Sequence, residues 1–299
     1  MPTITNANVA NAIVKLVAAD ALPALLGNLV MGNLVNRSFE PTLAQSGDTV
    51  NVPIPPSLSA NNIAAGGSVT TQNPSLGNAQ IVLNTHAEAT FQIPDVSKVV
   101  AVPDLLKLYM EPAIIAIAEK IESDLLGLYP LFTANSVAGA YNTAITESVI
   151  DSVETTLFNA KVPQGAKKFL VVDGSTYGTM RQIQRFSEQQ TMGNGFDAIA
   201  NGTFGKVKDL NVFRSQYVAV SGNNRNNLAF AENSIALVTR RLPQPLPGTG
   251  AIAEYAELGN FGMRILMSYA PNTLAQQFTV DVLYGASVIR PSHGVQVRS

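Results

Sequence analysis

The sequence of 299 residues predicts a mixed α+β fold, and three observations lead to this expectation. A long helical pattern occupies residues 102–130. A helix, a buried strand and another helix follow one another between residues 148 and 185. Alternating apolar residues indicate strands within residues 41–101 and again over most of residues 251–299. The chain is also long enough to bury a sizeable core.

The composition indicates a surface that partners cover. Charged residues make up only 13% of the chain, against about 25% in an average soluble domain. A monomer with so few charges would have a sticky surface. The absence of cysteine excludes a disulfide framework, a thiol nucleophile and a cysteine metal site. No signal peptide is visible, and the apolar run at 21–35 falls short of the ~20 residues that span a bilayer. We therefore expect no membrane association.

The charges are distributed unevenly along the chain. Residues 1–160 carry 5 basic and 13 acidic residues, a balance of −8, whereas residues 161–299 carry 14 and 8, a balance of +6. This asymmetry indicates either ordinary solvated faces or a subunit whose acidic half meets the basic half of a neighbouring copy. Strong nucleic-acid binding would need a denser basic patch.

The first hundred residues contain an apolar arm and an extended excursion. Residues 1–40 are weakly charged and mostly helix-like, and we leave open whether they pack on a neighbour or on their own core. Residues 41–101 are expected to form a long two-stranded excursion, with strands at about 50–54 and 81–93. The tip between these strands is rich in Ser, Asn and Gly, and no formal charge occurs from Thr49 to Ala87. Such a long loop is usually functional or disordered, so we expect it to lie on an adjacent subunit.

The helix at about 103–129 dominates the pattern. Its apolar residues recur at steps of 4, 3, 4 and 3 and form one stripe, at Ile114, Ala118, Ile121, Leu125 and Leu128. Glu119, Glu122 and Asp124 lie away from this stripe, so a solvated or salt-bridged face is expected for them rather than a glycosidase pair. Pro112 is expected to kink the helix or to mark where its regular part begins.

The second half of the chain alternates helices and strands. We expect helices at about 148–160 and from Asp173 to about 185, with the buried strand 168–172 between them. Residues 187–205 are loose and rich in Gly and Asn. The remaining predicted strands lie at 208–220, which includes a turn, and at 228–231, 235–242, 263–269, 278–285 and 287–291.

No catalytic, cofactor or metal site is predicted. His86 and His293 are isolated and are expected to be surface or interface residues. Asp173-Gly174-Ser175 follows a strand but lacks any phosphate-binding or nucleophile motif, so an ordinary helix-capping turn is favoured. Arg240-Arg241 and Lys206 with Lys208 are too few for a phosphate site without interleaved aromatic residues.

The order of these parts resembles the major capsid proteins of tailed double-stranded DNA phages, with the Hong Kong 97-type fold. The resemblance rests on KKFLVVDGSTYGTMRQIQR at 167–185, on 205–215, on 227–241 and on the strand-rich ending 258–291. It implies an N-terminal arm (1–40), an extended β-loop (41–101) and a spine helix with the first part of a peripheral domain (102–145). It further implies an axial domain (146–250) and a return to the peripheral domain (251–299).

The resemblance also implies function and partners. The chain would assemble into hexamers and pentamers of an icosahedral shell, in the host cytoplasm, and would reside in the virion capsid. In this arrangement the loop 55–78 lies over one neighbour, the arm 1–36 tucks beneath another, and the loop 187–205 meets its copies around the symmetry axes. A separate scaffolding protein, a portal and packaged DNA without sequence-specific contact are the other expected partners.

Two rival functions remain open. A bacterial nanocompartment shell would have the same fold but would enclose an enzyme rather than DNA. Alternatively, an α/β enzyme or ligand-binding domain would use the turn at Asp173, and it would be a monomer with a deep pocket there.

Overall fold

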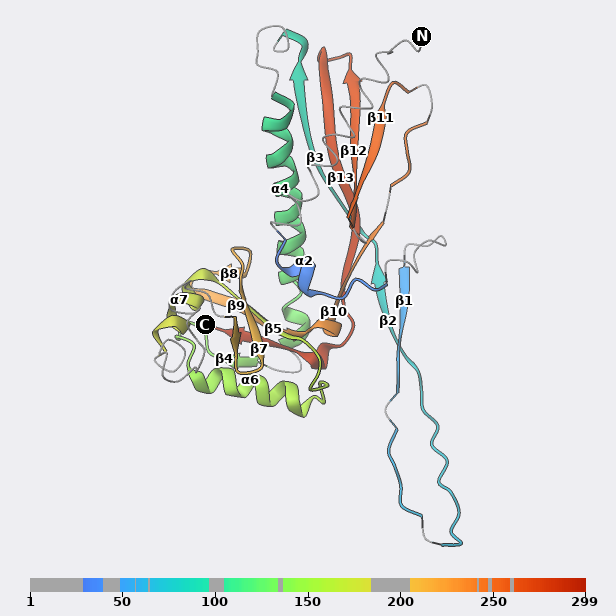
Figure 1. Ribbon diagram of the computed structural model, residues 1–299, viewed down its shortest axis with the longest axis vertical. Helices are drawn as coiled ribbons and strands as arrows, with labels where there is room; N and C mark the ends of the chain where they lie inside the picture. The colour runs from blue at the N-terminus through green and yellow to red at the C-terminus, as the bar shows by residue number, and fades with distance from the viewer. Residues whose placement is uncertain are drawn as a thin grey trace.

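The computed structural model describes residues 29–39, 49–56, 58–63, 65–96, 105–133, 137–183, 205–240, 242–246, 249–258 and 261–299. Two larger sheets and a two-stranded ribbon are arranged around one long helix, α4 (Figure 1). The sequence-based prediction of a mixed α+β fold is therefore confirmed. The predicted loop 187–205, apart from Gly205, and most of the arm 1–40 lie outside the described residues.

The long helix α4 extends over Leu105–Leu126 and continues through Pro112. The predicted stripe is confirmed at Ile114, Ala118, Ile121 and Leu125, which are buried, whereas its last member, Leu128, lies beyond the end of α4 and is only partly buried. Burial is wider than one stripe, however, since Met110, Ile117 and Leu126 are buried as well. A short helix, α5 (Pro130–Thr133), follows, with Pro130 at its first position, where a missing N–H costs nothing.

A five-stranded antiparallel sheet lies beside the upper part of α4 (Figure 1). Its longest strand, β13 (Ala275–Val288), pairs with β3 (Thr85–Pro94), with β12 (Phe261–Ala270) and, through its second half, with β10 (Ile235–Arg240). The edge strand β11 (Ile252–Leu258) pairs with β12. The rings of Phe91 and Phe278 stack with centroids 5.4 Å apart across β3 and β13.

A seven-stranded mixed sheet lies beside the lower end of α4 (Figure 1). The strand β5 (Lys168–Val172) lies between β9 (Asn224–Ala231) and β7 (Leu210–Arg214). It is buried throughout, because Phe169 and Val171 pack in the cluster that contains Ile121 of α4, while Leu170 and Val172 pack in a second apolar cluster. The remaining strands are β4 (Val137–Gly139), β6 (Lys206–Val207), β8 (Ala219–Ser221) and β14 (Gly294–Arg298). Helices α6 (Glu147–Asn159) and α7 (Gly174–Gln182) share a second apolar core with this sheet.

The ribbon consists of β1 (Thr49–Ile54) and β2 (Gly77–Val82), which pair in register from Thr49 opposite Val82 to Ile54 opposite Gly77. The residues between these strands reach far from the rest of the molecule (Figure 1). The base of the ribbon is anchored, because Val50, Val52 and Ile81 are buried in a third cluster with Ala236 and Val238 of β10.

The structure corrects several details of the sequence-based prediction. The expected single return strand 81–93 is two strands in different sheets, β2 in the ribbon and β3 beside β13. The expected strand 287–291 is wrong, because β13 continues to Val288 and a 3₁₀ turn at Pro291–His293 follows it. Strands β11 and β14 were not predicted. The last strand, β14, joins β9 and β4 in the seven-stranded sheet rather than the sheet of β13.

The described part of the N-terminal region packs on its own subunit. Leu29, Met31, Leu34 and Val35 belong to the central cluster that contains Ile121 and Leu125 of α4. A short helix, α2 (Met31–Leu34), forms there, and the N–H of Asn36 bonds to the carbonyl of Ile235 at 3.0 Å. For residues 29–36, packing on the chain's own core is therefore what the structure shows.

Gly285 in β13 allows the ribbon to cross this strand closely. A methyl group at Gly285 would lie 2.3 Å from the carbonyl oxygen of Val82, a contact that only a backbone shift relieves. We predict that Gly285→Ala lowers the free energy of unfolding by about 1–3 kcal/mol, as overpacking does. Urea denaturation of the unassembled chain measures this loss.

Gly178 in α7 is the matched control for this substitution. Nothing lies within 4 Å of a methyl group there, so Gly178→Ala is expected to stabilise the chain by up to ~1 kcal/mol through helix propensity. Equal effects of the two substitutions would contradict the close crossing at Gly285.

Candidate functional site

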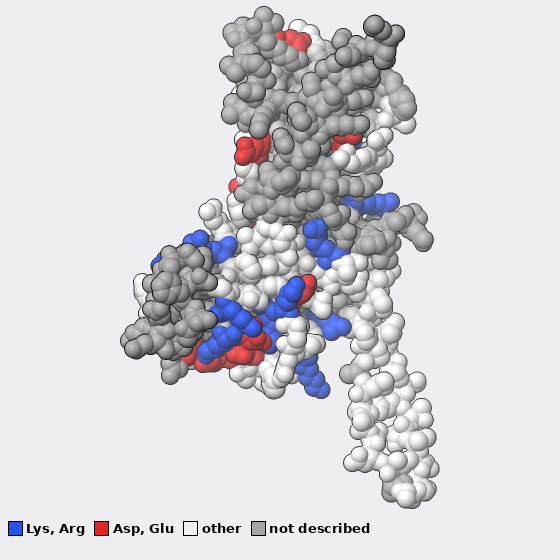
Figure 2. All heavy atoms as spheres, in the orientation of Figure 1, with Lys and Arg blue, Asp and Glu red and all other residues white. Residues whose placement is uncertain are grey.

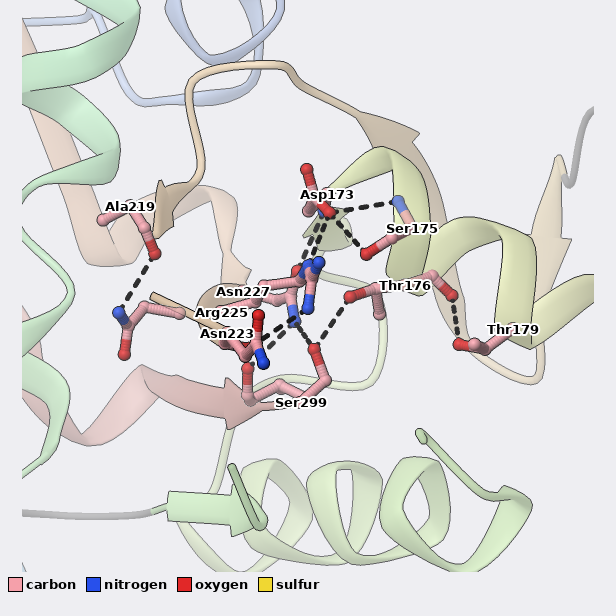
Figure 3. A network of polar contacts seen from close by, with 11 residues as sticks. Asp173, Ser175, Thr176, Thr179, Ala219, Asn223, Arg225, Asn227 and Ser299 are labelled. Carbon is pink, nitrogen blue, oxygen red and sulfur yellow. Dashed lines mark hydrogen bonds and ion pairs between the residues drawn. The ribbon is translucent and has the colours of Figure 1, made fainter. Parts of the chain in front are cut away.

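The turn at Asp173 is the first candidate, because the sequence left open a ligand site there. Asp173 is the N-cap of α7, and its Oδ2 accepts hydrogen bonds from the N–H of Ser175 at 3.0 Å and from Ser175 Oγ at 2.7 Å. Arg225 Nε donates to the same oxygen at 2.9 Å (Figure 3). The capping turn favoured from the sequence is therefore confirmed.

A polar network fixes this turn to strands β9 and β14. Asn227 Oδ1 accepts the Asp173 N–H at 2.9 Å, and Asn227 Nδ2 donates to Ser299 Oγ at 2.9 Å. The hydroxyls of Ser299 and Thr176 lie 2.8 Å apart (Figure 3). The adjoining hollow, of about 260 Å³, is bordered by Ser175, Thr176 and Arg225 among others. Because Ser175 and Arg225 both donate to Asp173, and Ser299 contacts Thr176 and Asn227, the arrangement joins α7, β9 and β14.

Internal hydrogen bonds also set the charge state of Asp173. Burial alone would raise the pKa of this carboxyl, but the hydrogen bonds from Ser175 and Arg225 outweigh it, so the pKa lies below its usual value. The carboxylate is therefore ionised at neutral pH, which suits a cap and an ion pair.

The two histidines lie in different surroundings. His86 in β3 is half-exposed, and its Nε2 lies 3.2 Å from Oδ2 of the buried Asp281. Arg264 Nε donates to Oδ1 of the same carboxylate at 3.0 Å. His293 is buried, so its expected surface position is wrong, and burial lowers its pKa. Within the described ranges, no three His, Asp or Glu side chains gather as a metal site would require.

Two of the predicted basic residues, Lys206 and Lys208, pair with acids of the same chain. Lys206 Nζ lies 2.9 Å from Asp209, which also binds the buried Lys168 at 2.7 Å. Lys208 contacts Asp151 and lies 3.7 Å from Glu147. The Lys208 pairs join the acidic and basic halves of the chain within one subunit. Arg241 lies outside the described residues.

The three acidic residues of α4 have separate environments. Glu119 accepts a hydrogen bond from the Tyr217 hydroxyl at 2.7 Å, and Asp124 accepts one from the Tyr284 hydroxyl at 2.6 Å. Glu122, by contrast, is 0% exposed, so its predicted place on a solvated or salt-bridged face is wrong. Glu122 lies four residues from the buried Ala118 and four from the buried Leu126, and the contact of its Oε1 with the N–H of Gly32 shows that α2 covers this position.

The tip of the ribbon is the candidate interaction surface, and we call residues 55–76 the loop surface. Four of its large apolar side chains are more than half exposed: Leu58 (67%), Ile63 (53%), Val69 (83%) and Leu76 (69%). Ser59 N donates to Gln72 Oε1 at 3.0 Å across the loop and ties its two sides together. Figure 2 shows the whole projection without a charged side chain, as the sequence predicts. Exposed apolar side chains on an uncharged projection make the loop surface the candidate for contact with a partner.

None of the helices that the structure describes is both long and apolar enough to cross a bilayer.

Comparison with known proteins identifies the fold. No protein-family model matches the sequence, and no curated protein matches it either. The structure is similar to one from Mycobacterium phage Che8, with a TM-score of 0.66 and 17% identity, covering 90% of each chain. It is also similar to the capsid of cyanophage P-SCSP1u, with a TM-score of 0.61 and 15% identity, covering 90% of this chain and 87% of that one.

A third similar structure is the virus-like particle from Pyrococcus furiosus, with a TM-score of 0.53 and 9% identity, covering 95% of this chain and 99% of that chain. Each of these similarities extends over nearly the full length of both chains compared. The chain therefore has the fold of tailed-phage capsid proteins, and the resemblance noted in the sequence is confirmed at the level of the fold.

The cap at Asp173 generates a prediction about stability. Asp173→Ala removes the acceptor for Ser175 and Arg225, and we expect a loss of about 1–2 kcal/mol in the free energy of unfolding at pH 7. The pKa of Asp173 is lowered in the folded chain, so its contribution is present above the carboxyl's unfolded pKa of 3.8 and is lost as the pH falls through the folded value. Chemical denaturation at pH 7 and near pH 3 measures both effects.

Asp173→Asn is the matched control, because it keeps a side-chain oxygen for the cap but removes the charge that Arg225 contacts. Its loss should be smaller than that of Asp173→Ala. An alanine variant as stable as the parent chain at pH 7 would contradict the structural role of this turn.

Proposed function

We propose that this chain is the major capsid protein of a tailed bacteriophage and that its copies form an icosahedral shell around double-stranded DNA. The observation that carries the proposal is the combination of the capsid fold with an uncharged loop surface that projects from the single subunit. Fold alone does not specify function, and the exposed apolar tip is the feature that a shell subunit needs and a monomeric enzyme does not.

The energetics of the loop surface support assembly. An isolated two-stranded ribbon is only marginally stable in water. Each large apolar side chain that a neighbour covers would contribute roughly 1.5–3 kcal/mol at most. The four exposed side chains of the loop surface would then stabilise one contact by several kcal/mol, before the entropy of ordering the loop is subtracted. Contacts of this kind, repeated head to tail, close into rings and shells.

We assign the parts of the chain to the roles that the capsid fold implies. The divisions are an arm (1–40), an extended loop (41–101), a spine helix with the first part of the peripheral domain (102–145), an axial domain (146–250) and the returning segment (251–299). The seven-stranded sheet, which β4 and β14 join from outside 146–250, would meet its copies around the axes of hexamers and pentamers. In this role the chain would act without catalysis, alongside a separate scaffolding protein, a portal and packaged DNA, in the virion capsid and assembled in the host cytoplasm.

A nanocompartment shell is the second candidate function. The likeness to the Pyrococcus furiosus virus-like particle, which covers 99% of that chain, favours it. The two functions differ in what the shell encloses. Nuclease-protected DNA in particles purified from their natural source supports the capsid function, whereas a co-purifying enzyme and no DNA support the nanocompartment.

Assembly of the purified chain tests the proposal directly. Size-exclusion chromatography with negative-stain electron microscopy, with and without a candidate scaffolding protein, should show closed shells or separate hexamers and pentamers. A compact monomer that never assembles in either setting would overturn the shell function and return attention to the hollow beside Asp173.

The loop surface should be necessary for assembly but not for folding. Because Ile54 and Gly77 pair directly, a two-residue Asn-Gly turn can replace residues 55–76 and close the ribbon. We expect this variant to keep its circular-dichroism spectrum and thermal midpoint within a few degrees but to form no closed shells under electron microscopy.

A second variant separates loop length from apolar contact. Leu58→Ser with Val69→Ser keeps the full loop and removes two exposed apolar side chains, so the concentration needed for assembly should rise at least tenfold. Normal shells from the shortened variant would show that the loop surface is not an assembly contact.

A further inference from the structure

Glu122 connects the middle of the chain to its N-terminal region. This side chain projects from α4 to the start of α2, where its Oε1 accepts the N–H of Gly32 at 3.3 Å. The N–H groups of Met31 and Val30 also contact the carboxyl. The cap residue Val30 has no side chain that could serve this purpose. Glu122 therefore caps a helix turn that lies about ninety residues earlier in the chain.

Apolar packing holds the same segment against α4. Leu29, Met31, Leu34 and Val35 are at most 8% exposed, and all four belong to the cluster around Ile121 and Leu125. We call residues 29–35 the docking segment. It is held by two kinds of contact, apolar burial and the backbone hydrogen bonds to Glu122.

The carboxyl of Glu122 has no charged partner among the described residues. It is 0% exposed, and its Oε2 has no hydrogen-bond partner in the described part of the chain. A cavity of about 370 Å³ adjoins it, lined by Val30, Ile115, Glu119, Arg214 and residues 215–217.

Besides Glu122, the ionisable groups that line this cavity are Glu119, Tyr217 and Arg214, and each of them contacts another side chain. Glu119, from α4 itself, accepts the Tyr217 hydroxyl. Tyr217 has a pKa of about 12, raised first by that hydrogen bond, and stays neutral. The Arg214 guanidinium, from β7, lies 5.0 Å over the ring of Tyr177. The helix α2, Met31–Leu34, carries no ionisable side chain.

Burial without a charged partner disfavours the ionised carboxylate. Desolvation raises the pKa of Glu122 from 4.5 to about 7, although the N–H groups of the docking segment act in the opposite direction. A carboxyl that leaves this site for water returns to the ordinary pKa. Undocking and ionisation are therefore linked.

We propose that Glu122 is a proton-coupled latch: docking of residues 29–35 on α4 takes up one proton at this carboxyl, and ionisation loosens the contact. The latch does not depend on the shell function. Since the pKa of the docked group is raised, docking is strongest below pH 4.5 and weakens as the pH rises towards and through 7. The equilibrium constant for docking should fall about thirtyfold between pH 5.5 and pH 8.5.

Hydrogen–deuterium exchange of the full-length chain tests the latch. Protection of the peptide that contains residues 29–35 is compared with that of a peptide from β5 in the same sample, which cancels the intrinsic pH dependence of exchange. The wild-type ratio should fall by about the predicted factor between pH 5.5 and pH 8.5. A ratio that stays constant with pH would overturn the proposal.

Two isosteric variants locate the proton. Glu122→Gln keeps an oxygen for the Gly32 N–H and cannot ionise, so its ratio should not change with pH. Glu119→Gln lines the same cavity and should retain the wild-type dependence. Persistence of the dependence in Glu122→Gln, or its disappearance in Glu119→Gln, would assign the proton elsewhere and overturn the latch. If Glu122→Gln fails to fold, the wild-type series and Glu119→Gln still decide the question.

Discussion

Burial of α4 is the constraint on which the rest of the structure depends. Ile121 and Leu125 belong to one apolar cluster with Phe230 of the seven-stranded sheet and Val280 of the five-stranded sheet. The helix thus provides a single core for two sheets that have no strand in common. A substitution that truncated a buried side chain of α4 would change the position of one sheet relative to the other as well as the local packing.

The path of the chain strengthens this connection. From β9 the chain passes through a 3₁₀ turn at Glu232–Ser234 into β10, and so leaves the seven-stranded sheet for the five-stranded one. It returns through Pro291–His293 into β14, which lies between β9 and β4. Both crossings meet at Ser234, whose carbonyl accepts the N–H of Ile289 at 2.8 Å. The two chain crossings between the sheets are therefore joined to each other by a backbone hydrogen bond.

The sequence predicted elements better than it predicted their partners. The stripe of α4 and the strand at 168–172 followed from local periodicity, and both are confirmed. Apolar alternation from 81 to 93 describes which face each residue occupies, but not that the strand changes sheets near Leu83 and Asn84. Strand β14 was missed although Val295 and Val297 alternate with Gln296, because Gln296 is buried and donates to Asn226 at 2.6 Å. Of the candidate surfaces, the loop was evident from its lack of charge, whereas Glu122 required the packing of α2 to be known.

The distribution of polar groups explains how one chain combines a firm subunit with adaptable contacts. Its ion pairs join elements within the subunit, as at Asp173 with Arg225 and Asp281 with Arg264. The loop surface has no charge, so a surface that covers it needs no complementary charge. In the proposed shell, copies that meet at slightly different angles in rings of five and six could share the same apolar contact, because apolar burial is not directional. Glu122 differs from both groups, since it is buried without a charged partner among the described residues. It therefore makes one internal contact sensitive to pH near neutrality, where the Asp173 carboxylate stays ionised.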